Sequence, residues 1–243
     1  MITPKEIERV TMTPEKRASA RNDYFAFYIG RPISYVLTIP FLYTKITPNQ
    51  VSIISIIPLL LGFVIMYIAS KNLGYSIGWL NFFLWFLLDG VDGNIARYRK
   101  QFTRLGSVYD AMAGYVAMVL APFAWGVAAS HHPGNFQNMI GIPLDLYIIL
   151  GAMSGVFVIF PRFMMHKAIT TIGKDEKLNS VKAKEHYNIV KVLALNIISI
   201  SSFMQVFMLL AISFNAFDLF TIIYFLINGV VMVASLISMF KNQ

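Results

Sequence analysis

The chain has 243 residues, of which 57% are hydrophobic and only 13% charged, and its mean hydropathy is +0.63. Soluble domains carry about 25% charged residues, and a chain of this length cannot bury so much apolar surface in a core of its own. The composition therefore excludes a soluble protein and predicts an integral membrane protein. The absence of cysteine excludes disulfides, zinc–thiolate sites and thiol catalysis, and the net charge of +8 favours contact with anionic headgroups or phosphate-bearing substrates over nucleic acid.

The N-terminal part of the chain mixes basic residues with aromatic and aliphatic ones. Charged residues are scattered through the first twenty positions, so we expect no cleavable signal peptide. Residues 14–45 carry Arg17, Arg21 and Arg31 among apolar side chains, which is typical of an amphipathic helix lying in the headgroup plane. We expect this helix to break at Arg31–Pro32, because proline lacks the amide that a helix needs. A linker with some hydrophobic residues is the alternative.

Six later stretches are long and apolar enough to cross a bilayer, which takes about 20 residues each. The first begins with a capping box over Thr47–Gln50 and a proline at the first helical position, and we expect Pro58 to kink it. The predicted spans cover residues 48–70, 75–96, 106–129, 143–166, 188–212 and 217–240. The expected fold is all-α and forms a single domain without internal repeats. Its interfacial part covers about residues 1–45 and its six-helix bundle about residues 48–240.

The distribution of basic residues predicts the orientation of the bundle. With six spans, both termini and the loops 97–105 and 161–187 share one side. That side holds 19 of the 20 Lys and Arg residues when Lys191 is counted with its loop, and only Lys71 lies opposite. Positively charged loops stay in the cytoplasm. We therefore expect both termini and the active site to face the cytoplasm, in a prokaryotic cell membrane.

Three aspartates lie inside the predicted spans, where acidic residues are rare and usually functional. Asp89 and Asp92 are three residues apart and so share one helix face. Asp110 lies one turn inside the next, antiparallel span, so we expect the three carboxylates to converge at one depth. Three such carboxylates repel one another unless a cation neutralises them. Mg²⁺ or Mn²⁺ suits the site, because both prefer oxygen ligands and keep positions for substrate phosphates.

Small and basic residues surround these acids. Small residues permit close helix packing, and beside carboxylates they also give a bulky nucleotide access to the backbone. The glycines in question are Gly90, Gly93, Gly106 and Gly114. In the connecting loop, Arg97 or Arg104 is a candidate clamp for a diphosphate. The alternative for this basic run is the ordinary positive-inside bias.

Seven of these residues resemble, in order and spacing over 22 positions, the signature of the CDP-alcohol phosphatidyltransferases: Asp89-x2-Asp92-Gly93-x2-Ala96-Arg97-x8-Gly106-x3-Asp110. The start of the first span, Thr47-Pro48-Asn49, is similar to that family too, as are six spans after an amphipathic segment.

The resemblance implies an integral-membrane transferase of phospholipid biosynthesis. A hydroxyl of the acceptor attacks the β-phosphate of a CDP-alcohol, and CMP leaves. Carried over residue by residue, the resemblance implies that the metal ions are held by Asp89, Asp92 and Asp110. It implies that the CDP moiety is bound by Asn49, Asp92, Gly93, Ala96, Arg97 and Gly106. It also implies a homodimer.

The sequence departs from the family pattern at its last position, where the family has a fourth aspartate and this chain has Gly114. In the family that aspartate helps to bind metal and is the proposed general base, so the base is unassigned here and Asp110 has a supporting role. Three explanations remain open. The acceptor itself or a bound water takes the proton; another residue, such as His166 or His186, replaces the base; or the chain binds metal and CDP-lipid without turnover, as a silent relative or through an introduced substitution.

Basic residues after the fourth span are candidates for binding the acceptor. Arg162 and Lys167 suit an acceptor phosphate, whereas the lysines over 174–184 are typical of a lipid-attracted loop. The sequence does not choose between CDP-diacylglycerol and a CDP-linked small alcohol as donor, nor does it identify the acceptor. A small transporter with an intramembrane acidic site is a further alternative, but transporters usually show inverted repeats, and this sequence shows none.

Overall fold

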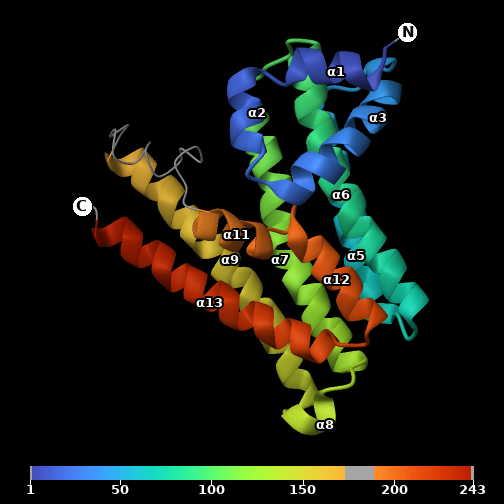
Figure 1. The fold of residues 1–243 in the computed structure, drawn as a ribbon, viewed down its shortest axis with the longest axis vertical. Coiled ribbons are helices and arrows are strands. Elements are labelled where there is room, and N and C mark those ends of the chain that lie inside the picture. Colours follow the sequence, from blue (N-terminus) through green and yellow to red (C-terminus); the bar gives the residue numbers. More distant parts are fainter. Residues whose placement is uncertain (1, 173–188, 242–243) are drawn as a thin grey trace.

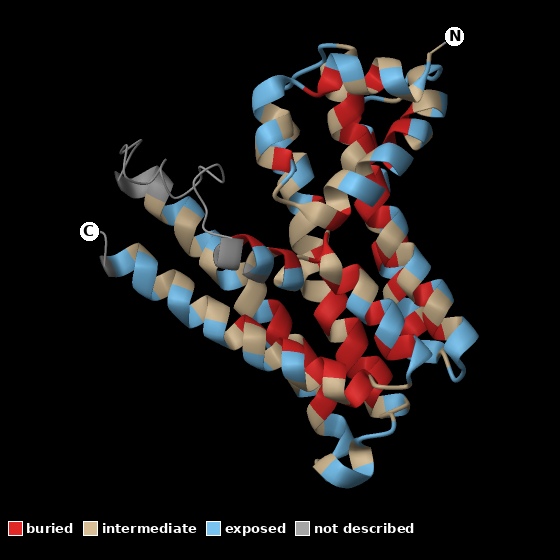
Figure 2. Cartoon of the chain, viewed as in Figure 1, coloured by how far each residue is buried: buried red, intermediate tan, exposed pale blue. Residues whose placement is uncertain are grey.

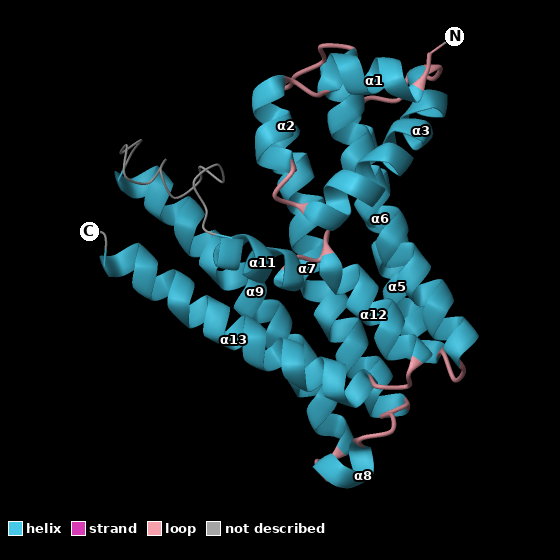
Figure 3. Cartoon of the chain, viewed as in Figure 1, coloured by secondary structure: helices cyan, strands magenta, loops and turns pink. Residues whose placement is uncertain are grey.

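A computed structural model describes residues 2–172 and 189–241, and every element in these ranges is a helix (Figures 1 and 3). The N-terminal elements are α1 (Pro4–Thr11), α2 (Pro14–Ala20), the π-helical turn η1 (Ala26–Gly30) and α3 (Arg31–Leu42). The remaining helices are α4 (Pro48–Ile54), α5 (Ile56–Ile68), α6 (Asn72–Tyr98), α7 (Gly106–His131), α8 (Gln137–Ile140), α9 (Leu144–Ile172), α11 (Ile189–Ile198), α12 (Phe203–Ser213) and α13 (Phe217–Lys241).

Four helical segments within the described ranges are long and apolar enough to cross a membrane: Pro48–Ile68, Gly106–His131, Leu144–Ala168 and Phe217–Phe240. They correspond to the first, third, fourth and sixth predicted spans. Helix α6 covers the second predicted span and has 27 residues, but it is not one of these four. The described part of the chain is therefore all-helical with long apolar helices, as the composition predicted for a membrane protein.

The start of the first span follows the sequence closely. The predicted capping box is confirmed, since the Thr47 amide donates to Gln50 Oε1 at 2.9 Å and the Gln50 amide donates to Thr47 Oγ1 at 3.3 Å. The span is interrupted at Ser55, between α4 and α5. Pro58 explains this interruption, because it has no amide to donate to the carbonyl of Ile54 and its ring crowds that carbonyl.

The prediction of one continuous helix over residues 188–212 is wrong. Helix α11 ends at Ile198 and α12 begins at Phe203, and each is too short to cross a bilayer alone. Serines fill the intervening segment, and serine side chains compete with the helix for local hydrogen bonds. Ser202 Oγ, for example, donates to Asn196 Oδ1 at 2.8 Å.

The predicted helix break at Arg31–Pro32 is also wrong. The π-helical turn η1 leads into α3 without interruption, and Pro32 lies in this continuous run. Its missing amide leaves one backbone hydrogen bond of the run unmade, and the π-helical turn, a local widening of the helix, falls just before it. The breaks fall earlier, after Thr11 and after Ala20. Helix α1 is joined to the end of α6, because the Tyr98 hydroxyl donates to Glu6 Oε1 at 2.8 Å.

The core lies where α5, α6, α7 and α12 meet (Figure 2). Large aromatic side chains such as Trp85, Trp125 and Phe82 are almost fully buried there. Helices α7 and α9 pack closely because both have glycine where they cross: a Cβ on Gly126 would lie 2.4 Å from the Tyr147 carbonyl oxygen. Helices α9 and α13 run side by side, with apolar side chains on their outer faces exposed (Figures 1 and 2).

Candidate active site

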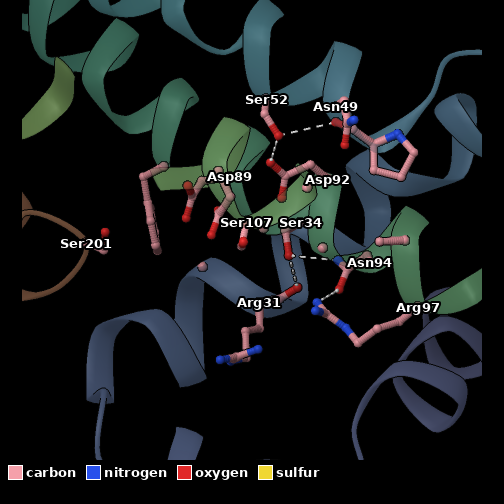
Figure 4. A pocket seen from close by; sticks show the side chains of 18 of the residues that line it. Arg31, Ser34, Asn49, Ser52, Asp89, Asp92, Asn94, Arg97, Ser107 and Ser201 are labelled. Atoms are coloured by element: carbon pink, nitrogen blue, oxygen red, sulfur yellow. Dashed lines mark hydrogen bonds between the residues drawn. The ribbon is translucent and has the colours of Figure 1, made fainter. Parts of the chain in front are cut away.

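A cavity of about 580 Å³ opens where the N-terminal segment, the start of α4, the second half of α6 and the start of α7 meet (Figure 4). Its volume is in the usual range for small-molecule sites, roughly 300–1,000 Å³. The seven motif residues and Asn49 all line it: Asn49, Asp89, Asp92, Gly93, Ala96, Arg97, Gly106 and Asp110. Gly114 follows Asp110 by one turn and is not among the lining residues.

The three predicted carboxylates come from two helices. Asp89 and Asp92 project from one face of α6, and Asp110 lies on the first turns of α7. Asp89 lies within electrostatic reach of both other aspartates. Asp92 is buried and accepts a hydrogen bond from the Ser52 hydroxyl of α4, whereas Asp110 is exposed. The capped start of α4 thus fixes one of the three carboxylates.

The donor chemistry of the cavity fits a hard divalent cation. Within residues 2–172 and 189–241, no group of three or more His, Cys, Asp or Glu side chains is drawn together into a metal site. The three aspartates nevertheless face one cavity, and the hydroxyls of Ser52 and Ser107 line it as well. Carboxylate and hydroxyl oxygens are the ligands that Mg²⁺ and Mn²⁺ prefer.

The glycines of α6 have two different roles. A Cβ on Gly90 would lie 3.0 Å from the Ser34 side chain, so this glycine lets α3 pack against α6. A Cβ on Gly93 would lie 2.7 Å from Arg97 Nη2 and 2.9 Å from Nη1. The space beside Gly93, which the sequence suggested for the nucleotide, therefore holds the guanidinium of Arg97.

Arg97 is held in place by a short chain of polar contacts. Its Nη2 donates to Asn94 Oδ1 at 3.4 Å, and Asn94 Nδ2 in turn donates to Thr38 Oγ1 of α3 at 3.1 Å. The buried Nε of Arg97 has no hydrogen-bond partner among the described residues. Arg97 therefore faces the cavity with unused donor capacity.

The other arginines of the 97–105 loop do not share this role. Arg104 is exposed and does not line the cavity. Arg99 is structural: its Nη1 donates to the Ile46 carbonyl at 2.7 Å and its Nη2 to the Thr44 carbonyl at 2.6 Å. Of the two clamp candidates named from the sequence, only Arg97 reaches the cavity.

A family model described as CDP-alcohol phosphatidyltransferase matches residues 45–240 of this chain. The chain belongs to the CDP-alcohol phosphatidyltransferase family. Members of this family transfer a phosphoalcohol group from a CDP-alcohol to an alcohol in phospholipid synthesis, so the resemblance in the motif is confirmed at the level of the family. A comparison with curated proteins finds no match.

The residues proposed for the acceptor lie elsewhere in the chain. Arg162 and Lys167 are on α9 and do not line the cavity. His166 is on the same helix, with its Nδ1 2.9 Å from the Tyr115 hydroxyl, and it does not line the cavity either. His186 and the lysines over 174–184 lie outside the described residues.

The N-terminal segment, ahead of the region that the family model matches, contributes lining residues that the motif did not indicate. They include Lys16 of α2, Arg31 of α3 and Asp23 between them. Burial, together with the nearby charges of Arg97 and Arg31, lowers the pKa of Lys16 to about 7. In the sequence these residues look like ordinary members of a basic amphipathic segment, so no local signal separates them from their neighbours.

Proposed function

We propose that this protein is an active CDP-alcohol phosphotransferase that moves a phosphatidyl or similar group from a CDP-alcohol to a hydroxyl acceptor, with release of CMP. The observation that carries the proposal is the convergence of the seven motif residues and Asn49 on one cavity. Family membership supports the reaction class. The donor is CDP-diacylglycerol or a CDP-linked small alcohol.

Asp89, Asp92 and Asp110 would hold the divalent cation, Mg²⁺ or Mn²⁺. Such an ion, when bound, neutralises the charge of the diphosphate and orients it. Ser52 keeps the Asp92 carboxylate directed at the cavity through its hydrogen bond. Asn49 lines the cavity at the start of α4, where its Nδ2 donates to Thr103 Oγ1 at 3.1 Å.

The remaining motif residues would bind the CDP moiety. Arg97, whose guanidinium occupies the space beside Gly93, would donate hydrogen bonds to the diphosphate. Charge-assisted hydrogen bonds of this kind are among the stronger ones. Ala96 and Gly106 leave room in the cavity because their side chains are small or absent, so that the nucleotide can approach the backbone. Holding both substrates in this way supplies much of the rate acceleration.

In the reaction, the acceptor oxygen forms a bond to the β-phosphorus, and the bond between that phosphorus and the bridging oxygen breaks. The electron pair of that bond stays with CMP. Glycine at position 114 can accept no proton, so we propose that a water molecule beside the exposed Asp110 takes the proton of the acceptor hydroxyl. Asp110 supports this transfer electrostatically, and no side chain serves as the general base.

We further propose that the whole chain forms one domain with six membrane crossings, in which α6 is the second and α11 with α12 together make a broken fifth. The positive-inside distribution supports a cytoplasmic position for the cavity and both termini. The protein acts as a homodimer. Arg162 or Lys167 binds the acceptor only if α9 approaches the cavity in the dimer or on substrate binding.

Nucleotide binding by the purified protein tests this assignment. We expect CDP to raise the unfolding temperature when Mg²⁺ or Mn²⁺ is present and not when EDTA replaces the metal, because a ligand at a hundred times its Kd stabilises the folded state by about 2.7 kcal/mol. Asp92→Asn should abolish the shift. Asp145→Asn, which changes an exposed acid on α9 outside the cavity, should preserve it. Metal-dependent stabilisation that survives Asp92→Asn would disprove the assignment of the carboxylates.

A further inference from the structure

Three cationic side chains from separate parts of the chain line the same cavity. Lys16 comes from α2, Arg31 from the first residue of α3 and Arg97 from the end of α6. Arg31 and Arg97 are close enough for their charges to repel, and both charges also act on Lys16. Figure 4 shows the two arginines on the side of the cavity that also carries Ser34 and Asn94.

Among the described residues, the ion pair joins Arg17 to Glu8 and involves none of these three cations. The Nε atoms of Arg31 and Arg97 are buried without a hydrogen-bond partner in that part of the chain. Among the described residues, Lys16 Nζ donates to the Thr11 carbonyl, at 3.4 Å. All three side chains are partly buried, and a cation removed from water is costly unless it is paired and hydrogen-bonded, so this cluster suits an anionic ligand.

The segment that supplies two of these cations is fixed at both ends. Asn196 of α11 is buried, and its Nδ2 donates to the Asn22 carbonyl at 2.6 Å while its Oδ1 accepts from the Tyr24 amide at 2.8 Å. At the other end Tyr98 donates to Glu6. Lys16 lies between these two contacts, and Arg31 follows them on α3, which packs against α6. Both are therefore held over the cavity by the fold.

We propose that Lys16, Arg31 and Arg97 form a phosphate-binding subsite next to the three carboxylates. Two arginines can grip phosphate oxygens with paired donors, and a lysine adds a point charge. The proposal rests on the proposed function for the identity of the ligand: the phosphate belongs to the CDP-alcohol donor or to a phosphorylated acceptor. Because residues 1–44 precede the family match, family membership assigns nothing to Lys16 or Arg31.

Binding measurements on the purified full-length protein test this subsite without any need for turnover. Calorimetry would titrate CDP in one arm and glycerol 3-phosphate in the other, both with Mg²⁺. Lys16→Gln and Arg31→Gln should each weaken binding by about tenfold or more in one arm, since a hydrogen bond to a charged group contributes about 1.5–3 kcal/mol. A loss confined to CDP assigns the subsite to the donor, and a loss confined to glycerol 3-phosphate assigns it to the acceptor.

Two further variants separate binding from folding and from nonspecific charge effects. Arg21→Gln makes the same charge change in the same segment at an exposed position outside the cavity, so both affinities should be unchanged. Lys16→Arg keeps the charge and should retain most of the affinity. Unchanged affinities in Lys16→Gln and Arg31→Gln, or an equal loss in Arg21→Gln, would overturn the proposal.

The outcomes for the subsite and for the reaction remain distinguishable. If the protein releases CMP while Lys16→Gln and Arg31→Gln bind both ligands like the wild type, the subsite is wrong and the proposed function stands. If no CMP forms under any condition, yet phosphate binding depends on Lys16 and Arg31, the proposed function fails and the subsite stands.

Discussion

Replacing Gly93 by alanine should remove Arg97 from its place without damaging the fold. The new Cβ would lie 2.7 Å from Arg97 Nη2, so the guanidinium must retreat by roughly 0.7 Å to reach an ordinary contact distance. Because the end of an arginine side chain moves easily, this shift should not lower the free energy of unfolding. Alanine in place of glycine in a helix interior should raise that free energy by up to about 1 kcal/mol. Losing one charge-assisted hydrogen bond should weaken CDP binding by about tenfold to a hundredfold.

Calorimetric titration with CDP and Mg²⁺, together with a thermal unfolding curve, measures both effects. The matched control is Gly114→Ala on α7, because a Cβ there meets nothing within 4 Å. It should give the same gain in stability and leave the affinity for CDP unchanged. If Gly93→Ala binds CDP as tightly as the wild type, the space beside Gly93 does not serve Arg97, and the role assigned to both residues is wrong.

Three other perturbations probe separate parts of the site. CDP-glycerol, whose diphosphate does not titrate between pH 6 and 9, should bind best below pH 7 and up to about tenfold more weakly for each pH unit above it. The reason is that Lys16, with its pKa lowered to about 7, loses its charge above that pH, whereas bound phosphate favours the charged form. A Lys16→Met variant that kept this pH dependence would refute the explanation. Arg99→Met should lower the free energy of unfolding by about 3 kcal/mol, since it removes charge-assisted hydrogen bonds to the Ile46 and Thr44 carbonyls. If chemical denaturation in detergent shows no loss of stability, Arg99 does not have this structural role. Gly114→Asp should fold like the wild type, because open space surrounds the position. It should raise the rate of CMP release by about a hundredfold, which is the lower end of what a positioned general base contributes. Unchanged turnover would show that a missing base does not limit the reaction.

The sequence predicted most of the site because the motif residues are close together in the chain. Asp89 and Asp92 share a helix face by their spacing alone, and a short loop brings Asp110 back beside them. The positions of four apolar spans followed from composition and length. These features depend on local periodicity, which a single sequence displays directly.

The features that the sequence did not reveal depend on contacts between distant segments. Lys16 and Arg31 reach the cavity because α1 to α3 fold back over the end of α6, and nothing in their local pattern indicates this. The role of Gly93 depends on the rotamer of Arg97. The break between α11 and α12 does not show in the sequence pattern, because the hydrophobicity of residues 188–212 outweighs the serines near Ser202.

Release of CMP is the most direct test of the central claim, that this cavity transfers a phosphoalcohol group. The purified protein would receive CDP-diacylglycerol or CDP-glycerol as donor, a pooled set of alcohol and phosphoalcohol acceptors, and Mg²⁺ or Mn²⁺. We predict that CMP appears only when metal and acceptor are both present, falls to background in Asp110→Asn and is unchanged in Asp145→Asn. CMP formation that persists in Asp110→Asn, or its absence from the wild type with every donor, would contradict the claim.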